Sequence, residues 1–318
     1  MYEVVGIDMP CMDLNVNTEH FPRAGRGETI RQLSWQGGNK VASGVVACAR
    51  LGIKCAMMGY VGDDIFGRFI MKDFERHGVN ISAMKVRESS TTSFSIVLSD
   101  YATGSRTIVF RTGCAPKYTL EDMDLRLLCD AKYFYISNAG EEVVKAVDIA
   151  RKAGVQIFID ADGYSDDIVS MIPKIDVFVG SEDFYRVMFS DENYEENCRK
   201  VMAMGSRIAV FTLGANGCAG VSEEGFFRLP AFPVKVVDTV GAGDLFHGAF
   251  LAGLLKNMAV EEAARFASAA AAIKCTRIGG RAGIPDVKTV EQFLKDGTID
   301  YTEIDKRVEF YARGLEHI

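Results

Sequence analysis

The chain has 318 residues, of which 48% are hydrophobic and 25% charged, and its formal net charge is −7 at pH 7. This composition supports a large buried core and excludes a disordered chain, and an acidic balance without a Lys/Arg cluster argues against nucleic acid or an anionic membrane as partner. Eight cysteines occur without a CxxC pair or a Cys/His ligand spacing, which indicates reduced thiols in a cytoplasmic protein. No apolar segment is long enough to span a bilayer, and residues 1–10 predict a first strand rather than a signal peptide.

Apolar runs alternate with amphipathic segments along most of the chain. YEVVGI (2–7), CAMMGYVG (55–62), VQIFIDA (155–161) and RIAVFTLG (207–214) predict strands, and EEVVKAVDIARK (141–152) is one of the helices between them. Strands that are apolar throughout are buried on both faces. The pattern therefore predicts one α/β domain over residues 1–318, with a mostly parallel sheet and helices on both of its faces.

Two segments, about 14–36 and 86–112, break this alternation because β-like runs follow one another without a helix. The second contains a hairpin signal, SDYATGSR (99–106). We expect a small β lid that stands off the main domain. Arg106 follows the glycine turn and Arg111 ends the next strand, so either could reach a substrate phosphate or carboxylate, although hairpin arginines are more commonly solvated.

The stretch DTVGAGD (238–244) places three small residues, Gly241, Ala242 and Gly243, directly before an acid and an apolar helical run. Such a turn leaves backbone N–H groups unpaired at a helix N-terminus, which is an anion site suited to phosphate. Asp244 falls in the first helical turn, where we expect a carboxylate of ordinary basicity. The pair suits deprotonation of a hydroxyl that attacks phosphorus, whereas the plain alternative is an ordinary helix acid after a glycine turn.

Several motifs together resemble those of one family. DTVGAGDLFHGAFLAGLL (238–255) resembles the C-terminal signature of the ribokinase-like (PfkB) sugar kinases, and GGNKVASGVVACARLG (37–52) is similar to their N-terminal signature. VGDDIFG (61–67) and TLGANG (212–217) fit two further family segments, so the resemblance covers nearly the whole chain. It implies a ribokinase-like fold and an ATP-dependent kinase that phosphorylates a small sugar, with Mg2+ as cofactor and a homodimer formed through the lids.

The resemblance also assigns roles near the nucleotide. It makes Asp244 the catalytic base and the amides of the Gly-Ala-Gly turn an anion hole. It places a monovalent cation, K+, near Asp238. The residues that it implies for nucleotide binding are Thr212, Gly214, Gly217, Ser181 and Ala271.

On the sugar side, the family uses an Asp after the first strand and a Gly-Gly-Asn loop. Asp13 is the candidate to bind sugar hydroxyls, with Asp8 as the alternative because the spacing is longer than usual. Gly38 and Asn39 are expected to approach the sugar. Lys40 contacts the substrate if the signature opens at Gly38, and it is a surface charge if the signature opens one residue earlier.

Departures from the family pattern leave rivals open. Ser181 and Phe184 stand at the ends of the usual NxxE motif, and DADGY (160–164) replaces DxNxR, so the handling of magnesium is open. One rival is a nucleoside kinase, for which the only lid aromatics are Phe94, Tyr101 and Phe110. The other is a catalytically silent protein that binds a sugar or nucleotide as a regulator.

Overall fold

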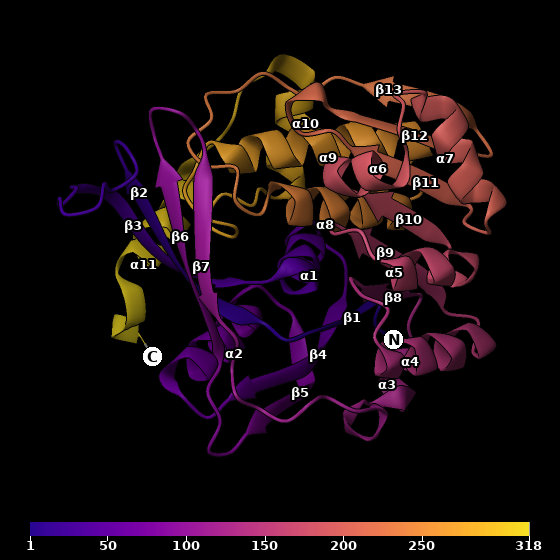
Figure 1. Ribbon diagram of the computed structural model, residues 1–318, viewed down its shortest axis with the longest axis horizontal. Coiled ribbons are helices and arrows are strands. Elements are labelled where there is room, and N and C mark those ends of the chain that lie inside the picture. Colours follow the sequence, from indigo (N-terminus) through magenta and orange to yellow (C-terminus); the bar gives the residue numbers. More distant parts are fainter. Residues whose placement is uncertain (318) are drawn as a thin grey trace.

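A nine-stranded sheet forms the centre of the computed structural model, which describes residues 1–317 (Figure 1). Seven strands are parallel, and the last two join one edge as an antiparallel hairpin. In spatial order the strands are β13 (Gly225–Leu229), β12 (Cys218–Ser222), β11 (Ile208–Thr212), β10 (Val177–Gly180), β9 (Gln156–Ala161), β8 (Tyr133–Ile136), β1 (Val4–Asp8), β4 (Cys55–Gly62) and β5 (Asn80–Arg87).

Helices cover both faces of this sheet, which confirms the predicted fold class. Neighbouring strand residues point to opposite faces, so Val4 and Val5 are both fully buried yet belong to separate apolar clusters. One face packs on α1 (Lys40–Arg50), α2 (Ile65–Arg76), α8 (Ala242–Leu255), α9 (Val260–Cys275), α10 (Val287–Asp296) and α11 (Thr302–Ala312). The other packs on α3 (Leu125–Cys129), α4 (Glu141–Lys152), α5 (Asp166–Met171), α6 (Glu182–Met188) and α7 (Tyr194–Ala203).

A second, four-stranded sheet stands beside the main one, at the left of Figure 1. Its order is β3 (Ile30–Gly38), β2 (Cys11–Thr18), β6 (Ser93–Asp100) and β7 (Arg106–Arg111). Most of these residues come from the two segments that break the helix–strand alternation. β2 and β6 are parallel and the other two pairs are antiparallel. The edge strand β7 is exposed along its whole length.

No helix within residues 1–317 has both the length and the apolar character of a membrane-spanning segment.

Candidate active site

The turn before α8 has the backbone geometry that its small residues predict. Gly241 is the N-cap of the helix and has a φ of 72°, a left-handed conformation that favours glycine. A Cβ at this position would also lie 2.7 Å from the Cα of Gly280, so the opposite loop leaves no room for a side chain. The tight approach of these two loops therefore fixes the entry to α8.

The amides of this turn are not equivalent. The N–H of Ala242 donates to the carbonyl of Thr239 at 3.2 Å, and the first helical bond runs from Leu245 to Gly241 at 3.0 Å. Within residues 1–317, the N–H groups of Gly241 and Gly243 donate no hydrogen bond to the protein. These two amides are therefore the free donors of the predicted anion hole.

Asp238 anchors the turn from behind. Its carboxylate accepts hydrogen bonds from the N–H of Val240 and of Gly279, both at 2.9 Å. Its main-chain carbonyl accepts a bond from the ammonium of Lys274, also at 2.9 Å. The side chain is 3% exposed, so these contacts tie the turn to the loop after α9 inside the protein.

A cavity of about 530 Å3 brings the turn together with the predicted sugar-binding residues other than Gly38, which does not line it. It lies between the carboxyl ends of the main-sheet strands and the four-stranded sheet, which is the usual position for a ligand in an open α/β sheet. The wall includes Asp13, Asn39, Lys40, Arg106, Asp162 and residues 239–244. Residues more than 200 positions apart in sequence therefore face one space.

Asp13 lies in β2 with its carboxylate in the cavity wall. It accepts hydrogen bonds from the Ser95 hydroxyl at 2.6 Å and from the Cys11 thiol at 2.9 Å. Burial raises the pKa of Asp13, and these two bonds oppose the rise. A Cβ on Gly38 would collide with the Asp13 carboxylate, so the glycine of the Gly-Gly-Asn loop makes room for this acid.

Asp8, the alternative to Asp13, has a structural task instead. Its carboxylate accepts bonds from the Asn39 amide at 2.8 Å and from the N–H of Ala42 at 3.1 Å, so it holds the start of α1. Burial raises its pKa to about 6. Asn39 has a φ of 82° and caps α1 through its own side chain. Asp8 does not line the cavity, which favours Asp13 as the sugar-binding acid.

Lys40 faces the cavity from the first residue of α1. Its ammonium is 3.0 Å from the Asp162 carboxylate. Although burial works in the other direction, Asp162, Asp160 and Asp244 raise the pKa of Lys40. Of the two registers that the sequence left open, the geometry favours the one in which Lys40 is part of the site.

Asp244 is more basic than its sequence position predicts. Burial raises the pKa of Asp244 well above its ordinary range, and the Asp160 and Asp162 carboxylates raise it further. His247 and Lys40 oppose this shift. The expectation of a carboxylate of ordinary basicity is therefore wrong, because it considered the helix terminus without the acids at the end of β9. A raised pKa makes the carboxylate a better proton acceptor once it is ionised.

His247 braces the same turn. Its Nδ1 lies 2.6 Å from the Gly243 carbonyl and 3.5 Å from the Asp160 carboxylate, and its Nε2 lies 3.3 Å from the Val179 carbonyl. Burial lowers the pKa of His247, which favours a neutral ring that donates to the Gly243 carbonyl. The buried His247 side chain thus orients the turn in addition to packing.

Both candidate arginines of the hairpin line the cavity. Arg106 donates a hydrogen bond to the Thr239 hydroxyl at 3.0 Å, next to the free amides, whereas Arg111 stands at the other end of β7. The aromatic rings divide between two places. Phe94 and Phe110 line this cavity, whereas Tyr101 lines a second one.

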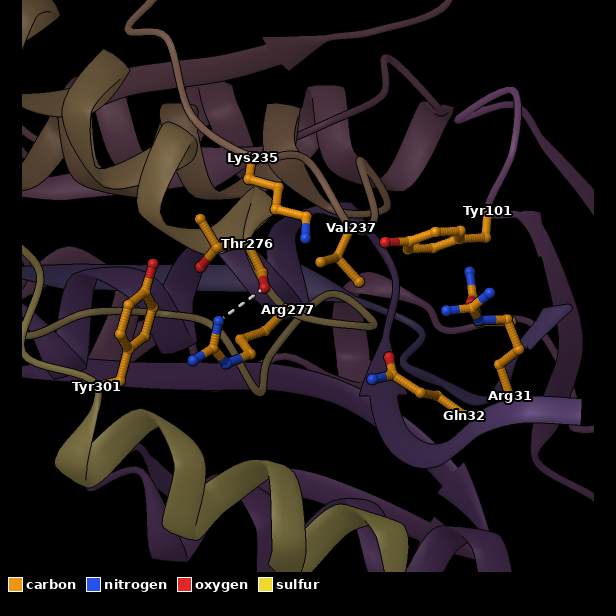
Figure 2. Close-up of a pocket in the computed structure, with 9 residues that line it drawn as sticks. Arg31, Gln32, Tyr101, Lys235, Val237, Thr276, Arg277 and Tyr301 are labelled. Carbon is orange, nitrogen blue, oxygen red and sulfur yellow. Dashed lines mark hydrogen bonds between the residues drawn. The ribbon is translucent and has the colours of Figure 1, made fainter. Parts of the chain in front are cut away.

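That second cavity, of about 320 Å3, lies between the four-stranded sheet and the loops that precede Asp238 and follow α9. Figure 2 shows the ammonium of Lys235 and the hydroxyl of Tyr101 on opposite sides of Val237. Arg277 also lines the cavity and forms an ion pair with Asp305 at 2.6 Å. Apart from Tyr101, none of the residues that the sequence analysis singled out lines this second cavity.

The residues predicted to bind nucleotide lie outside the main cavity. Ser181 caps α6, where its hydroxyl accepts from Phe184 N–H at 3.0 Å and contacts the Asp162 carbonyl. Thr212 ends the neighbouring strand and its hydroxyl is 3.4 Å from the Gly180 carbonyl. Gly217 packs so tightly on the Leu229 backbone that only glycine fits. The two remaining residues are Gly214, which opens a short 3-10 turn, and Ala271, which is half-buried in α9.

Asp160 and Asp162 are the site residues that sequence reasoning did not assign. DADGY was noted only as a departure from a family pattern. Their position in the sequence was the signal. Asp160 is in the last two residues of a buried parallel strand and Asp162 directly follows it, and the carboxyl ends of such strands meet at the ligand-binding edge.

An acid beside free amides at this edge is the arrangement of an enzyme that transfers a phosphoryl group to an alcohol. Residues 1–287 match the family described as pfkB family carbohydrate kinase. The chain therefore belongs to the pfkB family of carbohydrate kinases, and its acceptor is an alcohol group.

Curated relatives and solved structures agree with this assignment. The chain is 27% identical to a 5-dehydro-2-deoxygluconokinase of Clostridium perfringens, over 96% of each chain, and to one of Geobacillus kaustophilus, over 92% and 93%. The fold is similar to that of a protein from E. coli described as a ribokinase II, crystallised with ATP and Mg2+ (TM-score 0.82, 21% identity, 93% and 99% covered). It is also similar to ribokinase of Arabidopsis thaliana with ribose and ATP (TM-score 0.77, 22% identity, 92% and 99% covered). The predicted ribokinase-like fold is thereby confirmed.

Proposed function

We propose that this protein transfers the γ-phosphoryl group of ATP to a hydroxyl of a small sugar or sugar acid, with Asp244 as the base. The observation that carries the proposal is that Asp13, Asp244 and the free amides of Gly241 and Gly243 face one cavity. A sugar held by Asp13 presents a hydroxyl to Asp244, and the amides stabilise the charge on the transferred phosphoryl group. Lys40 and Arg106 add positive charge to the same space.

Mg2+ would enter with the nucleotide. Within residues 1–317, no group of three His, Cys, Asp or Glu side chains is placed to hold a metal ion, and Glu182 pairs with Arg186. This fits an ion that is bound mainly through substrate phosphates, as is common for magnesium in kinases. When bound, it would supply charge neutralisation at the phosphates. Ser181, Thr212, Gly214, Gly217 and Ala271 stay our proposal for the nucleotide surface.

The four-stranded sheet would act as the lid. Arg106, Ile108 and Phe110 alternate along β7 toward the cavity, so closure of this sheet would shield the reacting atoms from water. Val109, on the other face of this edge strand, is 60% exposed. An unpaired edge with exposed apolar residues supports the proposal of a homodimer through the lids.

The polar side chains around Asp13 favour a sugar over a nucleoside as the phosphoryl acceptor. Asp13 with the Ser95 hydroxyl suits a ligand rich in hydroxyl groups, whereas Phe94 stacks on Phe66 with ring centroids 5.1 Å apart and so is already engaged. A coupled assay of ADP formation over hexoses, pentoses, sugar acids including 5-dehydro-2-deoxygluconate, sugar phosphates and nucleosides tests the proposal. ADP formation that requires a sugar or sugar acid supports it. Turnover with nucleosides alone, or binding of ATP and sugar without ADP formation, would replace it by one of the rivals.

A further inference from the structure

Lys274 is a fully buried lysine behind the anion turn, which is the turn of residues 239–243 that leads into α8. Its side chain is 0% exposed, near the C-terminal end of α9, and its ammonium donates to the Asp238 carbonyl at 2.9 Å. Within residues 1–317 it forms no ion pair with a carboxylate. An ammonium buried without an anionic partner is costly, so its surroundings must stabilise a positive charge in another way.

The loop that carries Asp238 lies against the C-terminal end of α9, where Lys274 stands. The N–H groups of Val237 and Asp238 both donate to the Cys275 carbonyl, at 2.8 and 3.1 Å, which lays the loop against the end of α9. The last carbonyls of a helix carry partial negative charge from the aligned peptide dipoles. A Cβ on Gly283 would lie 2.6 Å from the Lys274 carbonyl, so a second loop approaches here as well. The ammonium of Lys274 is therefore buried at a helix C-terminus, and its hydrogen-bond acceptor is a neutral oxygen, the Asp238 carbonyl.

The resemblance implied a potassium ion near Asp238, and the residues present do not fit one. The Asp238 carbonyl, an oxygen that such an ion would use, already accepts from Lys274. The Asp238 carboxylate is also committed, to the N–H groups of Val240 and Gly279. We propose that the Lys274 ammonium takes the place of a monovalent cation behind the anion turn, so that this kinase works without potassium. Lys274 is thereby a positioning residue, because it holds Asp238 and the turn that follows.

Two measurements on the wild-type protein test this proposal. The measurement of kinase rate rests on the proposed function, whereas the measurement of thermal stability does not. Kinase rate and thermal unfolding midpoint are measured in potassium, sodium and tetramethylammonium chloride at equal ionic strength, about 0.1 M. We expect rates within about two-fold and midpoints within about 1 °C of one another, since only a bound ion would stabilise the fold selectively. A rate that needs potassium, or a midpoint that potassium raises selectively, would overturn the proposal.

The variant Lys274→Met removes the charge and keeps a flexible apolar side chain of similar length. We expect its kcat in tetramethylammonium to fall about 10- to 100-fold, because the anion turn loses its anchor. Potassium or ammonium should restore several-fold of this loss and raise the unfolding midpoint, whereas tetramethylammonium is too large to enter.

The control is Lys256→Met on the exposed C-cap of α8, with the same change of charge and no expected effect. The proposal would be contradicted if Lys274→Met had wild-type activity in tetramethylammonium. It would also be contradicted if potassium, ammonium and tetramethylammonium affected the variant equally. If the variant does not fold, the measurements on the wild-type protein decide.

Discussion

The two ends of the main cavity differ in how their charges are balanced. At the anion turn, both oxygens of Asp238 accept backbone hydrogen bonds, and the free amides are held by packing against Gly280. At the inner end, where β9 ends, the Asp162 carboxylate pairs with the Lys40 ammonium at 3.0 Å, and the negative charges of Asp160 and Asp244 also raise the pKa of Lys40.

This difference indicates that the anion turn suits stabilisation of phosphoryl charge and that the carboxylates suit proton transfer. The turn is a set of donors whose geometry does not change with protonation, which suits stabilisation of phosphoryl charge. Burial and neighbouring carboxylates raise the pKa of Asp160 and of Asp244, so the protonation of these two groups responds to pH and to a bound ligand. Substitutions at the two ends should therefore have different signatures.

Asp244→Asn should have the largest effect. The amide keeps the shape of the side chain but cannot accept the proton, so we expect kcat to fall about 10²- to 10⁴-fold. The same change removes one charge from the crowded cluster, so the unfolding midpoint should not fall. Steady-state kinetics and thermal unfolding with and without ATP measure both quantities. Turnover near the wild-type value would remove Asp244 from the role of base.

Asp13→Ala should act on sugar binding. Loss of a partly buried, charge-assisted acceptor costs about 1.5–3 kcal/mol, so we expect the KM for the sugar to rise about 10- to 100-fold while the KM for ATP changes little. Asp8→Asn is the matched comparison, because Asp8 holds the start of α1. That variant should lower the unfolding midpoint more than it changes the sugar KM, and the reverse pattern would exchange the two assignments.

Arg106→Gln, next to the anion turn, should give a smaller loss of activity. The guanidinium is exposed and contacts the Thr239 hydroxyl, so solvent screening limits its contribution. We expect kcat/KM for ATP to fall about 3- to 10-fold, with a steeper dependence on salt in the wild type than in the variant. Arg111→Gln, at the far end of the same strand, should change this ratio less than two-fold. Equal losses in both variants would indicate a general charge effect.

Asp160→Asn should show the smallest effect, as a pH-dependent change in stability. Burial, together with the Asp162 and Asp8 carboxylates, raises the pKa of Asp160 to about 7, although Lys40 opposes the rise. The folded state thus holds this proton more tightly than the unfolded chain, whose Asp pKa is about 3.9, so stability falls as pH rises between these values.

The amide variant cannot ionise and escapes this loss. We therefore expect its unfolding midpoint to exceed that of the wild type by about 3–6 °C at pH 8 and to match it near pH 4, by thermal denaturation across pH. Asp183→Asn, on an exposed turn of α6, is the control and should show no such trend. A stability gain that grows toward acid pH would mean that Asp160 is stabilised as a carboxylate.

The sequence by itself determined the parallel sheet, the turn before α8 and the family. These features depend on local chemistry, because apolar strands, helix N-termini and bare glycine turns are specified by residues close together in the chain. DTVGAGD places Asp244 and the turn's amides within seven residues, so this motif alone predicted both the free amides and the candidate base.

Only the tertiary structure decided which charged groups surround Asp244, and that the Lys274 ammonium lies behind the anion turn. Asp160 and Lys40 are 120 positions apart, and Lys274 reaches Asp238 across 36 residues. Burial and the proximity of these groups set the pKa of Asp244 and give Lys274 its place against the Asp238 carbonyl. Both depend on distances and solvent exclusion that arise only when the strand ends, the four-stranded sheet and α9 come together.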